Sequence, residues 1–178
     1  MFTKILKNKI FRTCLILIVI LLPVTSKYRF VKTIGPSMHP TLKDGEWFVI
    51  EKRSSLGKEW APKRFDSVVI GDKNENLCKR IIGLPGDVVE VKRGLIYLNG
   101  RELKDPFGKG KISIFLVDDD DNNLKYWDGP DAGEDVIELI DQGPEKIKEG
   151  YVWVIGDNRR DSWFGLLLIE DVVGKVLY

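Results

Sequence analysis

The sequence predicts a mainly β protein, an antiparallel-sheet domain preceded by one N-terminal transmembrane helix. Three observations predict this fold class. Short runs of β-branched and aromatic residues recur from residue 46 to the end of the chain, and turn signals separate them. No segment of this body shows a long helical repeat. An unbroken apolar run near the N-terminus supplies the single helix.

The composition is that of a globular protein with unevenly divided charge. Of the 178 residues, 43% are hydrophobic and 31% are charged, which argues against a disordered chain. The first 25 residues hold four of the 28 Lys and Arg and none of the 27 acidic residues, so 24 basic and 27 acidic residues remain. A mildly acidic body without a basic stripe is unsuited to nucleic acid, and we exclude that class of partner.

The N-terminal segment indicates a membrane anchor. Residues 1–9 are basic, and residues 10–25 contain an apolar core from Cys14 to Leu22. This pattern is typical of a secretory signal or a short transmembrane helix. The following PVTSKYRF offers no small-residue cleavage site, which favours an uncleaved anchor. Because a short basic N-terminus normally stays in the cytoplasm, we expect residues 26–178 on the extracytoplasmic face.

Short strands follow one another through the body. The predicted strands are residues 46–53, 66–71, 77–84, 87–94, 95–100, 151–156 and 172–178. The fourth and fifth predict a hairpin that turns at Arg93-Gly94. Residues 101–150 are acidic and turn-rich, and they predict an inserted, irregular β segment in which residues 133–143 have the pattern of a helical turn or two.

No metal or cofactor is expected. The acidic run 118–123 lacks the spacing of an EF-hand and predicts a solvated loop. Cys14 and Cys78 are far apart in the sequence, and the chain holds a single histidine, so these residues do not build a metal site.

The first candidate for chemistry is Ser37, which lies between two prolines in GPSMHPTL (35–42). Such a stretch predicts a fixed loop, where functional residues are often placed. His39 lies two residues on. In an extended segment these side chains would be about 7 Å apart, beyond the hydrogen bond that a general base must make. We therefore expect His39 to be an exposed loop residue and not the base.

The second candidate is Lys79, because a lysine buried among apolar groups can lose its proton and act as a base. It lies in NLCKRIIGLPGD, where alternation places it on one face with Leu77 and Ile81. Lowering a lysine pKa from about 10.4 to about 8 takes about 3 kcal/mol. An outward-facing strand lysine is the alternative. Cys78 faces the other way and is expected to be a packing residue.

The third candidate stretch is VIGDNRRDS (154–162), where a strand ends in a tight turn followed by Ser162. The hydroxyl of Ser162 is suited to hydrogen-bond an amine and hold it in line. We expect Asp157 and Asn158 to tie the turn to neighbouring backbone. By itself, this stretch is equally well interpreted as a polar β-turn.

Together these stretches resemble bacterial type I signal peptidase, a family of Ser/Lys-dyad proteases. The family pattern runs SMxPTL, KRxxGxPGD and GDNRxxSxDSR, and this chain reads SMHPTL (37–42), KRIIGLPGD (79–87) and GDNRRDS (156–162) in the same order. RFDSVVI (64–70) resembles a fourth element, with Phe65 in place of glycine. The resemblance covers the chain from the anchor onward, apart from the inserted segment.

The resemblance implies a signal-peptidase-like catalytic domain and a membrane-bound serine endopeptidase. Such an enzyme removes N-terminal signal peptides from exported preproteins at the outer face of the bacterial cytoplasmic membrane, and it needs no cofactor. We expect its partners to be preprotein substrates and membrane lipid, and the protein to be a monomer.

The resemblance also implies roles for individual residues. Ser37 would be the nucleophile, Lys79 the general base and Ser162 the hydroxyl that orients the Lys79 amine. The N–H of Ser37 would donate to the oxyanion. Gly35 belongs to the oxyanion region, at a position where some members carry a second hydroxyl donor. Residues expected to bind substrate are Val31, Thr33, Met38, Leu42 and Leu77.

One departure from the family pattern leaves alternatives open. After Ser162 the family continues x-Asp-Ser-Arg, whereas this chain continues WFGLLL, so the arginine is missing and the role of Asp161 is undefined. One alternative is a specialised peptidase of the pilin or conjugation type. Another is a non-catalytic membrane-anchored β-domain of the same fold.

Overall fold

The computed structural model describes residues 9, 12–13, 16–17, 24–57, 60–71, 76–117, 125–126 and 137–178. Most of the predicted anchor, residues 10–25, lies outside these described residues, as does the acidic run 118–123. In the part of the chain that is described, no helix is long and apolar enough to cross a membrane.

The body is mainly β, as predicted. Its strands are β1 (Tyr28–Lys32), β2 (Trp47–Lys52), β3 (Ser67–Gly71), β4 (Asn76–Gly83), β5 (Val88–Lys92), β6 (Leu95–Leu98), β7 (Arg101–Glu102), β8 (Ser113–Val117), β9 (Lys125–Tyr126), β10 (Ile137–Leu139), β11 (Gln142–Lys146), β12 (Tyr151–Ile155), β13 (Phe164–Leu168) and β14 (Val172–Leu177). Short 3₁₀ turns at Arg53–Ser55 and Ile169–Asp171 connect strands.

Two local predictions about these strands have different outcomes. The hairpin of β5 and β6 does turn at Arg93-Gly94, where both residues have positive φ angles of 50° and 72°. The predicted helical turn within residues 133–143 is wrong, because Ile137–Leu139 pairs with β8 as strand β10. Its apolar residues gain strand hydrogen bonds there. β1 and β13 were not among the predicted strands.

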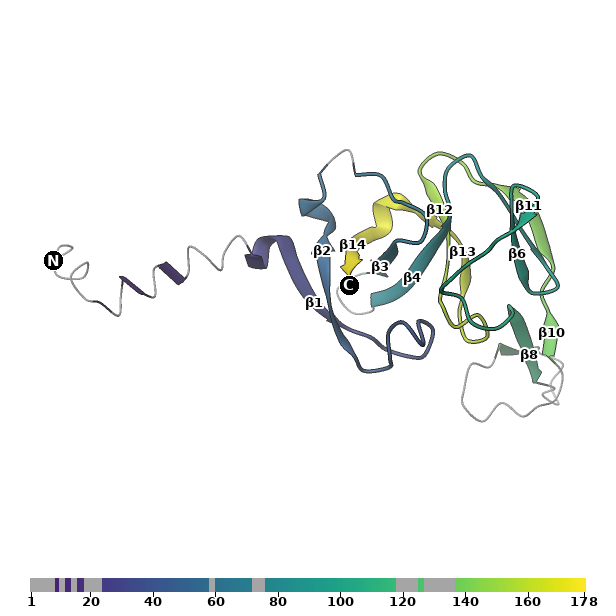
Figure 1. Cartoon of the computed structure of the whole chain (residues 1–178), viewed down its shortest axis with the longest axis horizontal. Helices are drawn as coiled ribbons and strands as arrows, with labels where there is room; N and C mark the ends of the chain where they lie inside the picture. Colours follow the sequence, from purple (N-terminus) through teal and green to yellow (C-terminus); the bar gives the residue numbers. More distant parts are fainter. Residues whose placement is uncertain are drawn as a thin grey trace.

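Seven strands form the main sheet, in the order β1-β2-β14-β3-β4-β12-β13. All the neighbouring pairs in this order are antiparallel. A second sheet has the order β11-β5-β6-β7, and a third has the order β10-β8-β9. Figure 1 shows the main sheet at the middle of the molecule, with the second sheet beyond β12 and β13 and away from the N-terminus.

The first core lies under the β1 end of the main sheet. Alternate residues of successive strands face one interior, so the sheet curls around a shared apolar cluster. The cluster consists of Val31, Met38, Leu42, Phe48, Ile50, Val69, Cys78 and Val176. It takes residues from β1 at one edge and from β4 beyond the middle of the sheet, and the loop after β1 is packed into it.

The strand β4 is buried on both faces, and this positions the candidate site. Ile81 packs with residues of β3, β12 and β14 in one cluster. Ile82 packs with Trp153 and with residues of the second sheet in another. Because side chains alternate along a strand, Lys79 lies on the Ile81 side and Arg80 lies on the Ile82 side.

Candidate active site

Ser37 lies in the loop of residues 33–46 between β1 and β2, which we call the Ser37 loop. The base of this loop is closed by hydrogen bonds. The N–H and the hydroxyl of Thr33 both donate to the carbonyl of Glu46, each at 2.9 Å, and the N–H of Gly45 donates to the carbonyl of Thr33 at 3.1 Å. These bonds hold the two ends of the loop together.

Val31 and Thr33, which were expected to bind substrate, direct their main-chain groups to β2. The main-chain N–H and C=O of Thr33 are directed to the β2 side, and residues two apart in a strand point the same way, so those of Val31 are too. The outward main-chain groups of this edge therefore belong to Lys32 and Ile34. The side chains of Val31 and Thr33 are also buried.

The other expected substrate-binding residues divide into two groups. Met38 is fully buried and Leu42 nearly so, and both pack in the first core beneath the Ser37 loop. In this structure they support the loop from below and present almost no surface to a peptide. Leu77 of β4 is 50% exposed and is accessible to a substrate.

Gly35 has a backbone conformation that explains its residue type. Its φ of 83° lies in the left-handed region, where a side chain would be strained. Its N–H donates to Oδ1 of Asp44 at 2.9 Å, so that donor is already engaged. Within the described residues, the N–H of Ser37 has no hydrogen-bond acceptor. The Ser37 N–H is thus an available main-chain donor here.

Lys79 is buried in the main sheet, with 3% of its surface exposed. It lies opposite Val68 of β3, on the apolar face that carries Ile81. Burial lowers the pKa of Lys79 from 10.5 to about 8, against a small raising influence from Cys78. Among the described carboxylates, none forms an ion pair with Lys79. The protonated amine is therefore not stabilised by an anion, and its hydrogen-bond partner is a hydroxyl.

That hydroxyl is Ser162, which is buried after the turn that follows β12. Nζ of Lys79 donates to Oγ of Ser162 at 3.1 Å, and the N–H of Gly156 donates to the same oxygen at 2.6 Å. Ser162 Oγ in turn donates to the carbonyl of Trp163 at 2.9 Å. Because the Ser162 proton is committed to Trp163, the hydroxyl holds the amine as an acceptor and leaves the amine lone pair free.

The turn at residues 156–162 also contacts the Ser37 loop. The N–H of Asn158 donates to the carbonyl of Ser37 at 3.0 Å. A Cβ on Gly156 would overlap both that carbonyl and Ser162, so only glycine fits between them. Ser37 and Lys79 thus both adjoin Ser162. In the described part of the chain no hydrogen bond joins Ser37 Oγ to Lys79 Nζ, and such bonds often tighten only when substrate binds.

Sequence reasoning missed a buried ion pair next to these residues. Nε and Nη2 of Arg80 donate to the two carboxylate oxygens of Asp157 at 2.6 and 2.5 Å, and both residues are almost completely buried. Thr41 of the Ser37 loop donates its hydroxyl to the same carboxylate at 2.5 Å. This ion pair joins the Ser37 loop, β4 and the turn after β12. Alternation along β4 places the Arg80 side chain inside the protein, and a buried arginine requires an acid partner. This reasoning could have predicted the ion pair from the sequence.

Of the two expectations for the turn, one is corrected and the other is confirmed. The side chain of Asp157 binds Arg80 and Thr41, and not neighbouring backbone atoms. Asn158 does bind backbone, since its Nδ2 donates to the carbonyl of Pro36 at 3.4 Å. Nδ2 of Asn158 also donates to Asp161 at 2.7 Å, so Asp161 closes the turn itself.

Two other residues occupy the places that the sequence predicted for them. His39 is exposed in a turn, where its N–H donates to the carbonyl of Pro36 at 2.9 Å. Cys78 is buried in the first core, and burial raises the pKa of its thiol to about 12. A thiol with that pKa is not a nucleophile at neutral pH.

Sequence comparisons with known proteins agree on one family. The family described as "Signal peptidase, peptidase S26" matches residues 6–178. Signal peptidase I of Bacillus caldolyticus is 34% identical over 148 residues, covering 80% of this chain and 73% of that protein. Signal peptidase IB of Staphylococcus aureus is 34% identical over 154 residues, covering 81% and 73%. A crystal structure of a signal peptidase I from Enterococcus faecalis V583 matches 67% of this chain and 98% of that chain, with 26% identity and a TM-score of 0.41.

Proposed function

Because the chain belongs to the signal peptidase family, peptidase S26, and is thus a peptidase that processes signal peptides, we propose that it is a membrane-bound serine endopeptidase with a Ser37 nucleophile and a Lys79 general base. The observation that carries this proposal is the buried Lys79 amine. It has no carboxylate partner among the described residues, and it is held by Ser162 beside the Ser37 loop.

The lowered pKa of Lys79 supports its role as the base. At pH 7 an amine with a pKa of about 8 is neutral in about one molecule in ten, far more than for an ordinary lysine. A base whose pKa lies near the working pH transfers protons most efficiently. Ser162 contributes by fixing the direction of the lone pair.

The proposed reaction has two stages. Ser37 Oγ attacks the carbonyl carbon of the scissile peptide bond, and its proton moves to Nζ of Lys79. The N–H of Ser37 donates to the oxyanion that forms. The C–N bond then breaks and the leaving amine takes the proton from Lys79. A water, deprotonated by Lys79, hydrolyses the acyl-enzyme and releases Ser37.

The substrate would bind in an extended conformation between two strand edges. No described strand adjoins the outer edge of β1, and β4 pairs with β12 only from Arg80 onward. The main-chain groups of Lys32 and Ile34 on one side and of residues 76–79 on the other are suited to bind a peptide as an added strand. Met38 and Leu42 fill the space under the Ser37 loop, which leaves little depth for a substrate side chain and favours small residues at the cleavage site.

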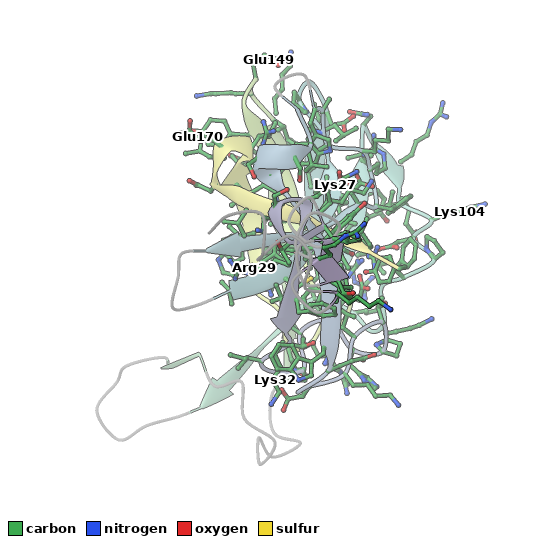
Figure 2. The ribbon with its side chains drawn as sticks, turned by 90° about the vertical axis from the view of Figure 1, so that its left-hand side faces the viewer. Lys27, Arg29, Lys32, Lys104, Glu149 and Glu170 are labelled. Carbon is green, nitrogen blue, oxygen red and sulfur yellow. The ribbon has the colours of Figure 1, made fainter. Side chains whose placement is uncertain are left out.

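We also propose that the domain lies at the extracytoplasmic face of the bacterial cytoplasmic membrane. Only residues 25–36 separate Val24 from Ser37, so an anchor in that segment would keep the site near the bilayer. Lys27 directly precedes β1, and Arg29 and Lys32 lie within it, on the side of the molecule that faces the viewer in Figure 2. Basic residues there favour anionic lipid headgroups.

The test is cleavage of purified preproteins by the full chain in detergent. Wild type and His39→Ala are expected to cleave at the signal-peptide boundary, whereas Ser37→Ala and Lys79→Ala lose at least about 10³-fold in rate. His39 is the matched control because it is exposed in the same loop. Cleavage of a single pilin-like preprotein would favour the specialised peptidase, and no cleavage of any preprotein would favour the non-catalytic domain.

A further inference from the structure

A six-residue segment outside the three motifs lies against the turn that carries Ser162. Residues 105–110 (DPFGKG), which we call the strap, connect β7 to β8. Lys109 of the strap forms a parallel bridge with Asn158. The N–H of Lys109 donates to the carbonyl of Asp157 at 2.7 Å, and the N–H of Arg159 donates to the carbonyl of Lys109 at 3.0 Å. The strap is therefore paired with the turn like a short strand.

The strap also holds the turn through a buried ion pair. Asp105 accepts a hydrogen bond from Nη2 of Arg159, and the side chains of both residues are only 7% exposed. Nε of Arg159 donates to the carbonyl of Gly156 at 3.1 Å. A side chain on Gly108 would overlap the Arg159 guanidinium, so the strap lies flat against it. Asp105 thereby fixes Arg159, and Arg159 fixes Gly156.

Gly156 connects this ion pair to the chemistry. Its carbonyl is bound by Arg159, and its N–H donates to Oγ of Ser162, which accepts the Lys79 amine. A shift of Gly156 therefore moves the hydroxyl that directs the amine. Misplacement of a catalytic group by about 1 Å costs on the order of 100-fold in rate.

The second contact of the strap is with the buried Arg80–Asp157 ion pair. The Arg80 guanidinium lies 3.7 Å from the centroid of the Phe107 ring, and that ring packs tilted on Phe65 at 5.7 Å. An aromatic ring at this distance attracts the cation and covers it from water. Phe107 thus keeps Arg80 on Asp157, which in turn holds Thr41 of the Ser37 loop.

We infer that Asp105 and Phe107 are positioning residues for the reaction: the strap holds Ser162 in line with Lys79 through Arg159, and holds the Ser37 loop through Arg80. This inference rests on the proposed function. It assigns a kinetic role to residues that do not touch the substrate. A purely structural role for the strap would affect the amount of folded protein but not the turnover of the folded fraction.

The experiment measures kcat, KM and the pH profile of the full chain in detergent, beside thermal unfolding. Asp105→Asn keeps the side-chain oxygen that accepts the N–H of Phe107 at 2.9 Å but removes the charge facing Arg159. We expect kcat to fall by about 10- to 100-fold with KM within about two-fold. We also expect kcat/KM to rise at a higher pH than in wild type. A displaced Ser162 admits water to Lys79, which restores a more ordinary lysine pKa.

Phe107 supplies a second pair of variants. Phe107→Leu removes the ring under Arg80 and is expected to lower kcat by about 10-fold. Phe107→Tyr keeps the ring and is expected to retain wild-type turnover. Lys104→Gln is the matched control, since Lys104 directly precedes Asp105 and points away from the body in Figure 2. It should leave all three quantities unchanged.

The outcomes separate the two proposals. If wild type cleaves, Ser37→Ala does not, and the Asp105 and Phe107 variants keep kcat within two-fold while unfolding at lower temperature, the strap only packs and this inference is overturned. Should Asp105→Asn fail to fold, Phe107→Leu decides the question alone. A wild type without peptidase activity overturns the proposed function, and the positioning role with it.

Discussion

Lys79 and Arg80 are neighbours on β4, both basic and both almost completely buried, yet their surroundings differ. Arg80 faces Asp157, which accepts two hydrogen bonds from its guanidinium. Lys79 faces the apolar side of the main sheet, where a serine hydroxyl accepts its hydrogen bond. One cation is paired with a buried anion and the other is not.

The pKa values follow from this difference. Burial works to lower both. For Arg80, the hydrogen bond and the charge of Asp157 outweigh burial, and the pKa is raised. For Lys79, burial prevails and the pKa falls to about 8. Burial alone therefore does not lower the pKa of a cation; burial without an acid partner does. The comparison predicts opposite responses when each cation is removed.

The largest effect is expected for Lys79→Met. Peptidase activity should fall by at least about 10³-fold, because no base remains for Ser37. The unfolding free energy at pH 7 should rise by up to about 3 kcal/mol, since the folded protein no longer has to bury an amine whose pKa is lowered from 10.5 to about 8.

The sign of the pH dependence follows from the same shift. Between pH 8 and pH 10.5 the unfolded chain binds the Lys79 proton more than the folded protein does, so wild-type stability rises with pH in this window. The advantage of Lys79→Met should be constant below pH 8 and vanish above pH 10.5. Urea unfolding of both proteins at pH 7 and pH 10 measures this difference in unfolding free energy. Lys92→Met, at an exposed position, is the control. A variant less stable than wild type at pH 7 would contradict this account.

Arg80→Met should do the reverse and destabilise the fold. It leaves Asp157 buried without its cation, which typically costs about 3–5 kcal/mol. Denaturant unfolding at pH 7 checks this value. Adding Asp157→Leu removes the stranded charge, and the double variant should regain part of the loss. A single variant within about 1 kcal/mol of wild type would mean that Asp157 finds another partner.

The pH dependence of cleavage sharpens the comparison further. Because only the neutral amine of Lys79 accepts a proton, kcat/KM should rise about ten-fold per pH unit below 7 and level off above about 8. Ser162→Ala should lower the plateau by about 100-fold, since the amine loses the oxygen that directs it. Ser162→Thr keeps a hydroxyl and should retain more activity. A profile that is flat from pH 6 to pH 9 is incompatible with Lys79 as the base.

The smallest effect concerns Cys78, which directly precedes Lys79 on β4. With a pKa of about 12, its thiol should react with a thiol reagent at pH 8 at least about 100-fold more slowly than an exposed cysteine, until urea unfolds the domain. The experiment uses a Cys14→Ser background, in which Cys78 is the remaining thiol. Cys78→Ala should cost about 1 kcal/mol of stability and leave cleavage unchanged. Rapid labelling of the native protein would show that the first core opens near Lys79.

Much of the local structure was predictable because short-range patterns determine it. Short runs that contain β-branched residues predict the strands β4 and β12. The Arg93-Gly94 turn predicts the hairpin of β5 and β6. β13 was missed because FGLLL holds a glycine and three leucines but no β-branched residue, so it lacks the composition typical of a strand. β1 was missed because its short YRFVK begins only three residues after the end of the predicted anchor.

The sequence by itself determined which residues are candidates for chemistry. A serine between prolines, a lysine in an apolar strand and a serine after a tight turn named Ser37, Lys79 and Ser162 as candidates. Local composition suffices there, because alternation predicts that a side chain points inward. The pKa expected for Lys79 followed from the same local apolar neighbours.

Only the tertiary structure decided what lies opposite each of these side chains. Asp157 meets Arg80 across 77 positions of the chain, and Asp105 meets Arg159 across 54. It also decided that Thr33 directs its main chain to β2, which leaves Lys32 and Ile34 at the open edge. The physical reason is that a strand pattern specifies the direction of a side chain, whereas its charge state and position depend on the partners that distant segments supply.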